Sequence, residues 1–177
     1  MKAEIPQNFH RHSVTFKSSL SGKENPTASI VNGMSFILVE LPDLESLGRV
    51  KEEGNLNKDT YNPSVLDEGW RDGLVGTMYF VSQGVDGLGR KRYRTRMFVS
   101  SEDPGTGSAS SALGCYLALE DGGEGKETSK FVFEQGVEMG RRNEIVVDVV
   151  RTEDGKGIKK VLLSGEAVAV MEGTLEV

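Results

Sequence analysis

The sequence predicts an α+β fold in which many short strands surround one buried helix. Twenty-two glycines and only five prolines are spread among short apolar segments, a distribution typical of tight turns between strands. The segment Ser108 to Leu119 is small and apolar on nearly every side, which is the composition of a helix enclosed by other elements. With 177 residues, of which 37% are hydrophobic and 27% charged, the chain is long enough for one domain with a core.

The first 29 residues are predicted to be a remnant strand followed by a linker. Ala3 to Ile5 has strand character, but Pro6 follows it, and Ser18 to Ser29 is polar and rich in serine. The folded part is therefore predicted to span residues 30–177. It opens with the continuous apolar run Met34 to Leu41, which predicts a buried strand, and continues with a helix over Asp43 to Glu53 capped by Asp43.

A hairpin is predicted after the polar, turn-rich segment Asn55 to Gly69. Its strands are Leu74 to Ser82 and Lys91 to Ser100, joined by a glycine-rich connection. Alternation places Arg92, Arg94 and Arg96 on one face of the second strand. We interpret this face mainly as a solvated surface of an edge strand. Only Arg96, the arginine nearest to the next loop, is retained as a candidate substrate-binding residue.

Four further strands are predicted after the central helix and the loop Asp121 to Ser129. They are short, rich in valine and separated by glycine turns, and they cover Lys130 to Met139, Asn143 to Arg151, Ile158 to Ser164 and Glu166 to Val177.

Charge and cysteine content exclude several classes of function. A formal net charge of -6 and a pI near 5.1 argue against a nucleic-acid partner, which normally requires a basic face. A single cysteine, Cys115, excludes an internal disulfide, and the polar N-terminus lacks a signal-like apolar segment. No run of about 18 apolar residues is present to span a membrane. We therefore expect a cytoplasmic protein without a membrane partner.

The most informative segment is Glu102-Asp103-Pro104-Gly105-Thr106-Gly107-Ser108-Ala109, which places a carboxylate beside the start of the buried helix. Pro104 pushes Asp103 into extended geometry, and Thr106 or Ser108 can cap the helix. The first amides of a helix lack internal acceptors and lie at the positive end of its dipole, so they can hold a substrate carboxylate or phosphate. Asp103 beside such an anion would keep its proton to higher pH and act as a general acid or base.

The alternative interpretation of this segment is a capped turn in which Asp103 is simply solvated, and spacing alone favours it. A dinucleotide site is discounted, because the glycine pattern lacks its third glycine and no ribose-binding acid follows.

Three groups of residues together resemble the PhzF-like (phenazine biosynthesis-like) family. They are Arg96-Met97-Phe98 with Glu102 to Ala109, Phe133-Glu134-Gln135-Gly136 with Met139-Gly140-Arg141, and Leu163-Ser164-Gly165-Glu166-Ala167-Val168. The resemblance covers about residues 30 to 177 and corresponds to the second lobe of the family. It implies a single diaminopimelate-epimerase-like lobe, a β-barrel of mostly antiparallel strands wrapped round a central helix.

The resemblance also implies acid/base catalysis without cofactor or metal. Asp103 matches the catalytic position, and Gly107 and Ser108 match the helix-start amides that hold the substrate. With Gly105, Thr106 and Arg96, these two form the predicted substrate-binding set. The family's other catalytic residue is a glutamate of the first lobe, accompanied by a Gly-His motif, and neither is found in this sequence. Residues Met1 to His12 look like the last strand of such a first lobe, and we treat the Asn25-Pro26 pair as coincidental.

Two functions remain open after the resemblance. One is a homodimer whose two Asp103 loops line a shared cavity, with isomerase or epimerase activity on a small anionic or polar metabolite. The other is a catalytically inactive half that binds a metabolite or a protein.

Five other residues are weighed against plainer interpretations. His10 and His12 would share a face on a strand, but two ligands alone make a poor zinc site, so no metal is expected. Cys115 is expected to be a packing residue. Trp70 and Tyr79 either line a pocket or fill the core, and the core is favoured.

Overall fold

The computed structural model describes residues 2–5, 8–18, 20–51, 63–121, 128–168 and 170–174. Its strands form one mixed sheet in the order β1-β10-β9-β8-β6-β5-β4-β3-β2, with β7 paired to the outer end of β6. β4 and β5, and likewise β6 and β8, run parallel, whereas the other described pairs are antiparallel. The strands are β1 (Lys2–Ile5), β2 (His10–Lys17), β3 (Glu24–Val31), β4 (Met34–Glu40), β5 (Leu74–Val85), β6 (Lys91–Phe98), β7 (Glu102–Asp103), β8 (Thr128–Gln135), β9 (Asn143–Arg151) and β10 (Ile158–Gly165).

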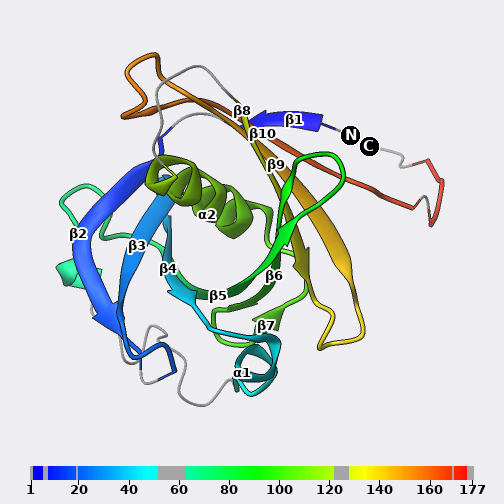
Figure 1. Ribbon diagram of the computed structural model, residues 1–177, viewed down its shortest axis with the longest axis horizontal. Helices are drawn as coiled ribbons and strands as arrows, with labels where there is room; N and C mark the ends of the chain where they lie inside the picture. Colours follow the sequence, from blue (N-terminus) through cyan, green and yellow to red (C-terminus); the bar gives the residue numbers. More distant parts are fainter. Residues whose placement is uncertain are drawn as a thin grey trace.

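The sheet curls round the central helix α2 (Gly107–Glu120), which lies inside the curve (Figure 1). Among the described residues, the strand pairs form a path with β1 and β2 at its two ends, and no pairing joins these ends. The predicted arrangement of mostly antiparallel strands round a helix is confirmed, but closure into a barrel is not seen in this part of the chain. The described helix that follows Pro42, α1 (Leu44–Gly48), and the short 3-10 helix η1 (Pro63–Val65) lie outside the curve.

Strand β4 separates two apolar clusters, which explains its continuous apolar sequence. Phe36 and Leu38 face α2, whereas Ile37 and Val39 face the cluster that contains Leu47 of α1. All four β4 side chains are essentially inaccessible to solvent. The predicted strand Met34 to Leu41 is confirmed, and so is the cap, since the Asp43 side chain accepts a hydrogen bond from the Ser46 amide.

Helix α2 is buried along most of its length, as its small apolar residues predicted. Cys115 and Leu113 lie in the inner cluster, and a Cβ added at Gly114 would lie 3.1 Å from the side chain of Val147. Burial raises the pKa of the Cys115 thiol, which keeps it protonated and unreactive. Its predicted packing role is confirmed, as is that of the fully buried Tyr79.

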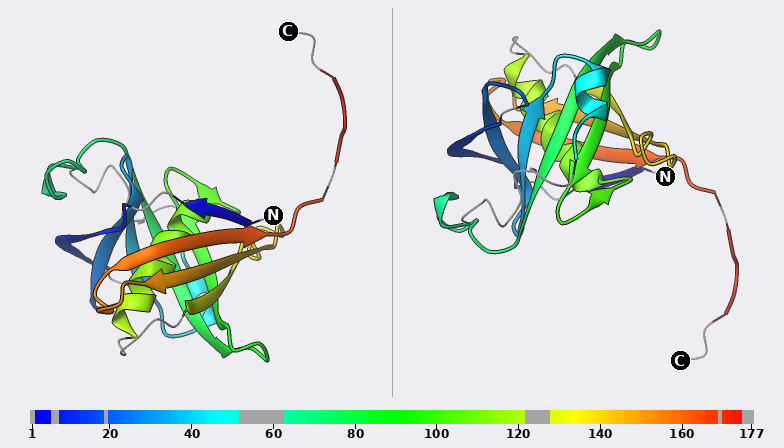
Figure 2. Two further views of the ribbon diagram at one scale, coloured as in Figure 1. Left: turned by 90° about the horizontal axis from the view of Figure 1, so that it is seen from above. Right: turned by 90° about the horizontal axis from the view of Figure 1, so that it is seen from below.

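Three sequence expectations differ from the structure. Residues 10–17 and 24–29, expected to belong to the remnant strand and linker, lie in strands β2 and β3 of the sheet. The strand expected over Glu166 to Val177 is not formed by residues 166–168 and 170–174, which lead away from the body of the fold (Figure 2). The helix expected over Asp43 to Glu53 ends at Gly48. The turn-rich segment from Asn55 lies outside the described residues as far as residue 62.

Strand β6 is an internal strand rather than the expected edge strand, because β5 and β8 flank it. Arg92 and Arg94 therefore meet carboxylates presented by the neighbouring part of the sheet, with Arg92 paired to Glu144 at 3.2 Å and Arg94 to Glu134 at 2.6 Å. Within the described residues, no helix is long and apolar enough to cross a membrane.

Candidate active site at the start of helix α2

Strand β7 directs its two acidic side chains to different partners, as alternation on an extended segment requires. Glu102 forms a two-pronged ion pair with Arg96, from Nε to Oε1 at 2.8 Å and from Nη2 to Oε2 at 2.6 Å. Asp103 turns instead toward the start of α2. Of the two neighbouring acids, only Asp103 lies at the predicted site, in agreement with the sequence argument.

Arg96 holds protein segments together. Its Nη1 donates to the carbonyl oxygens of Leu47 at 3.0 Å and Val50 at 2.9 Å. Arg96 is buried, with only 8% of its surface exposed. The hydrogen bonds that Arg96 donates to Glu102 raise the pKa of Arg96 above its ordinary value. Its observed partners join β6, β7 and the end of α1, which differs from the contact with substrate that the sequence led us to expect.

The Asp103 carboxylate is held by uncharged donors. Its Oδ2 accepts a hydrogen bond from the Thr106 hydroxyl at 2.6 Å, and its Oδ1 accepts one from the Gly105 amide at 3.2 Å. It makes no ion pair with any other described residue, and it is half-buried. Within the described part of the chain, the Asp103 carboxyl group therefore lies beside the helix start with hydrogen bonds from neutral donors only.

Gln135 fixes the loop from the end of β8. This fully buried side chain accepts a hydrogen bond from the Thr106 amide at 3.1 Å and donates one to the Asp103 carbonyl at 2.6 Å. Asn143, at the start of β9, donates to the Pro104 carbonyl at 2.8 Å. Neither was predicted as a site residue, although Gln135 belongs to one of the motifs that carried the family resemblance.

The start of α2 has the open amides that the sequence predicted. Thr106 is the N-cap residue, but its side chain makes no capping hydrogen bond; the hydroxyl instead donates to Asp103 and accepts from Gln135 Nε2 at 3.1 Å. In the part of the chain that the structure describes, the amides of Gly107 and Ser108 have no acceptor. The helix therefore retains unpaired donors at its positive end, where an anion is favoured.

A cavity of about 740 Å³ adjoins this helix start. Its walls include Gly105 and Gly107, the first residues of β9, and the end of β10 with the segment that follows; Asp103, Thr106, Ser108 and Arg96 are not among its lining residues. Gly107 lies close to the opposite wall, because a Cβ placed on it would lie 2.8 Å from a methyl group of Leu163. The lining residues are Ala3, Gly105, Gly107, Arg142, Asn143, Glu144, Ile145, Leu163, Ser164, Gly165, Glu166, Ala167 and Val168.

Arg142 brings positive charge to the cavity wall. Its guanidinium contacts Glu134 at 2.5 Å and Glu144 at 3.1 Å, and the hydrogen bond with Glu134 raises the pKa of Arg142 above its ordinary value. Sequence reasoning did not single out this residue, although the Met139-Gly140-Arg141 motif lies directly before it. The wall thus combines backbone donors with one partly exposed cation.

Comparison with known proteins identifies the family of this chain. The family model described as phenazine biosynthesis-like protein matches residues 5–173. The chain belongs to the phenazine biosynthesis-like protein family. The match begins well before residue 30, where the sequence resemblance was expected to start, and so includes strands β2 and β3.

A solved structure shares the fold of this family member. The crystal structure of the Bacillus anthracis phenazine biosynthesis protein of the PhzF family superposes with a TM-score of 0.64 at 20% sequence identity. The match covers 99% of this chain and 60% of the Bacillus anthracis chain, so the present chain spans well under two thirds of that protein. A search of curated proteins gave no match.

Proposed function

We propose that this chain is a proton-exchanging lobe of a cofactor-independent isomerase that acts on a small anionic or polar metabolite. Asp103 is the general acid or base, and the amides of Gly107 and Ser108 bind the anionic group of the substrate. Gly105 and Thr106 shape this binding loop. The observation that carries the proposal is the Asp103 carboxylate, held by two neutral donors beside unpaired helix amides, in a loop whose Gly105 and Gly107 line a cavity.

The chemistry follows from this arrangement. Asp103 removes a proton from a carbon atom next to the anionic group, and the charge that develops is stabilised by the helix amides. Returning the proton at another position or face requires a second acid or base. In the proposed homodimer, the Asp103 of a second copy would provide it, since an isologous interface repeats the same residues on both sides.

Exposed apolar side chains after β10 support association with a second copy. Val168, Val170 and Met171 are 86%, 91% and 93% exposed, and Val168 also lines the cavity. Closely spaced exposed apolar residues of this kind are favourable contact points for another chain. Because Val168 belongs to the cavity lining, a second copy that buries these three side chains would also cover the cavity.

Replacing Asp103 by asparagine tests the catalytic proposal. The variant should lose solvent-deuterium incorporation into a panel of small carboxylates, measured by NMR, by about 100-fold or more, because it removes the proton carrier. Asparagine can still accept from the Gly105 amide, so the circular dichroism spectrum and melting temperature should change little. Unchanged exchange at wild-type rates would contradict the proposal.

Asp154→Asn is the matched control for this variant. Asp154 also accepts hydrogen bonds from a threonine hydroxyl, that of Thr152, and from a backbone amide, that of Lys156, but it lies in the turn between β9 and β10 away from the cavity lining. Its replacement should leave exchange intact.

The particle mass tests the dimer. Light scattering at micromolar concentration should give twice the 19.3 kDa mass of the chain. Val170→Asp should weaken the dimer by about tenfold or more, since it buries an unpaired charge in the interface. Leu88→Asp, at a hairpin position that is also highly exposed at 75%, should not. A wild-type monomer at these concentrations would exclude a shared site.

A catalytically inactive binding lobe is the alternative. It is favoured by the fact that both Asp103 oxygens accept hydrogen bonds within the loop, which is also how an aspartate stabilises a turn. In that case Asp103→Asn would alter neither proton exchange nor ligand binding.

A further inference from the structure

Three potential metal ligands converge on the outer side of β2, far from the site described above. His10 and His12 are the only histidines of the chain, and they are two residues apart on one strand. Asp67 reaches them from the segment that follows η1, with its Oδ2 2.7 Å from His10 Nε2 and 3.9 Å from His12 Nδ1. One ligand atom from each of the three lies within 4.8 Å of the others. None of the three lines the α2 cavity.

His12 supplies the observation that points to a ligand. Its side chain is completely buried, and its Nδ1 has no hydrogen-bond partner among the described residues. Its Nε2 lies 2.9 Å from the hydroxyl of Ser29, which in turn lies 2.8 Å from that of Ser35. When Nε2 donates to Ser29, the Nδ1 lone pair faces the Asp67 carboxylate, and these two electron-rich atoms lie 3.9 Å apart without a hydrogen bond between them.

We propose that His10 Nε2, His12 Nδ1 and Asp67 Oδ2 bind a divalent transition-metal ion of the zinc class. Two imidazoles and one carboxylate are a ligand set for such ions, and they leave at least one coordination position for water or an exogenous ligand. In a tetrahedral zinc site the ligand atoms are about 3.4 Å apart, as bond lengths near 2.1 Å require. The two observed distances to Asp67 Oδ2 lie on either side of that value.

The surroundings hold the three ligands in place. Ser13 donates its hydroxyl to Asp67 Oδ1 at 2.6 Å and its amide to Asp67 Oδ2 at 3.2 Å, and these hydrogen bonds hold the carboxylate with Oδ2 close to the histidines. The ring of Trp70 stacks on His10, with centroids 4.8 Å apart, and meets His12 edge-on at 5.7 Å. Hydrogen bonds and packing of this kind orient metal ligands in proteins. The Ser29 hydroxyl does the same for His12.

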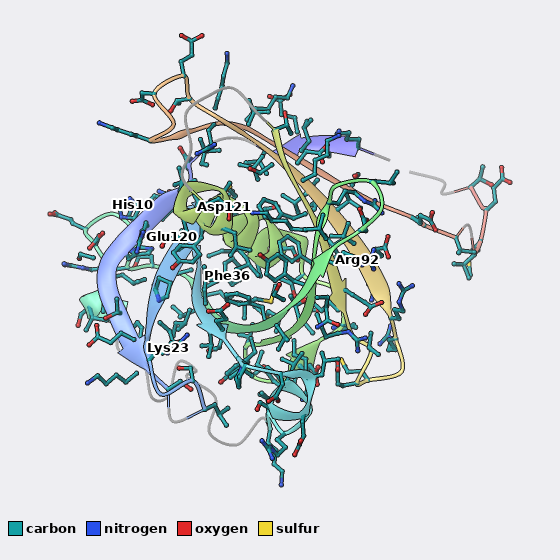
Figure 3. All side chains as sticks on the ribbon, in the orientation of Figure 1. His10, Lys23, Phe36, Arg92, Glu120 and Asp121 are labelled. Atoms are coloured by element: carbon teal, nitrogen blue, oxygen red, sulfur yellow. The ribbon has the colours of Figure 1, made fainter. Side chains whose placement is uncertain are left out.

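The site is open to solvent on one side. The side chains of His10 and Asp67 are 33% and 27% exposed, so an ion can enter while His12 forms the floor. Figure 3 shows His10 on the β2 side of the molecule, across the fold from Arg92. The sequence alone suggested two histidine ligands and no metal; Asp67 changes that expectation, because it lies more than fifty residues away in the chain and only the fold brings it there.

Trp70 makes the proposal directly measurable, because it is the only tryptophan and touches both histidines. The chelator-treated full chain is titrated with zinc chloride or cobalt chloride. We expect a saturable, equimolar change in tryptophan emission, the visible absorption of low-symmetry Co²⁺, and a higher melting temperature with Zn²⁺. Asp67→Asn should weaken zinc binding about tenfold or more, since changes even outside the ligand shell cost about 10- to 100-fold.

Asp154→Asn serves as the control, because it removes a carboxylate that also accepts a hydroxyl and an amide hydrogen bond elsewhere in the fold and should leave the titration unchanged. His10→Asn provides a second ligand variant on the exposed side, so the test does not depend on Asp67→Asn remaining folded, and circular dichroism reports folding in each case. Absence of a saturable response in the wild type would overturn the proposal. So would zinc affinity that His10→Asn and Asp67→Asn leave unchanged in folded protein.

Discussion

Replacing Gly136 by alanine should lower the free energy of unfolding by about 3 kcal/mol or more, the sum of backbone strain and overpacking. Gly136 has φ +76°, which side chains other than glycine rarely adopt. A Cβ at this position would lie 2.4 Å from the Arg141 carbonyl oxygen and 2.7 Å from the Pro104 carbonyl oxygen. Both are backbone atoms, so neither can rotate away. Urea unfolding followed by circular dichroism measures the effect.

Gly140→Ala is the matched control for this prediction. Gly140 lies in the same turn with φ +68°, but a Cβ there would meet no atom within 4 Å. Gly140→Ala should therefore lower the free energy of unfolding only by the conformational strain, about 1 kcal/mol. The difference in the free energy of unfolding between the two variants measures the effect of the close approach of the β8–β9 turn to Pro104. Equal losses would show that this approach does not constrain the loop.

The effect of Gly136 on the site follows from its neighbours. Gln135 precedes it and holds the Asp103 loop through the Thr106 amide and the Asp103 carbonyl. A turn forced open at Gly136 would displace Gln135 and so weaken its hydrogen bonds to the Thr106 amide and the Asp103 carbonyl. Any deuterium-exchange activity should therefore fall in Gly136→Ala even under conditions where the protein remains folded, whereas Gly140→Ala should retain it.

Elements buried on all sides were the ones that the sequence predicted best. β4 and α2 carry uninterrupted apolar residues because each meets the core on more than one face. β2 and β3 were mistaken for a linker for the opposite reason. β2 buries fully only His12 within its length, and β3 buries Thr27 and Ser29, polar residues whose place in the core depends on tertiary partners.

The segment after β10 shows the limit of strand propensity. Val168 and Val170 favour an extended conformation, but a strand also needs a neighbour with free hydrogen-bonding groups. β10 already pairs with β9 on one side and with β1 on the other, through Lys2 to Ile5. The described residues beyond Gly165 therefore find no place in the sheet, although their composition is that of a strand.

Local contacts of the candidate site were predictable, whereas contacts across the sheet were not. Asp103 and Thr106 are three residues apart, so chain geometry alone brings their side chains within reach. Gln135 and Asn143 reach the same loop from 29 and 39 residues away, through the pairing of β8 with β6 and β9. Strand register, which no short pattern specifies, decides such contacts.

Replacing Arg96 by methionine should lower the free energy of unfolding by about 3 to 5 kcal/mol, because it breaks a buried ion pair on one side only. The Glu102 side chain, 10% exposed, would lose the guanidinium that binds both of its oxygens, and the carbonyl groups of Leu47 and Val50 would lose their donor. Chemical denaturation measures this loss. Arg96→Lys should recover only part of it, since an ammonium group cannot serve both Glu102 oxygens and the α1 carbonyls at once.

A double-mutant cycle with Glu102→Gln separates the two consequences. If the penalty arises from loss of the Arg96–Glu102 ion pair, Arg96→Met combined with Glu102→Gln should be more stable than Arg96→Met alone. The same variants distinguish the observed role of Arg96 from the role that its sequence position first suggested. An arginine that bound substrate would raise KM when replaced and leave stability unchanged, whereas an arginine that joins β6, β7 and α1 lowers stability and leaves the KM of the folded fraction largely intact.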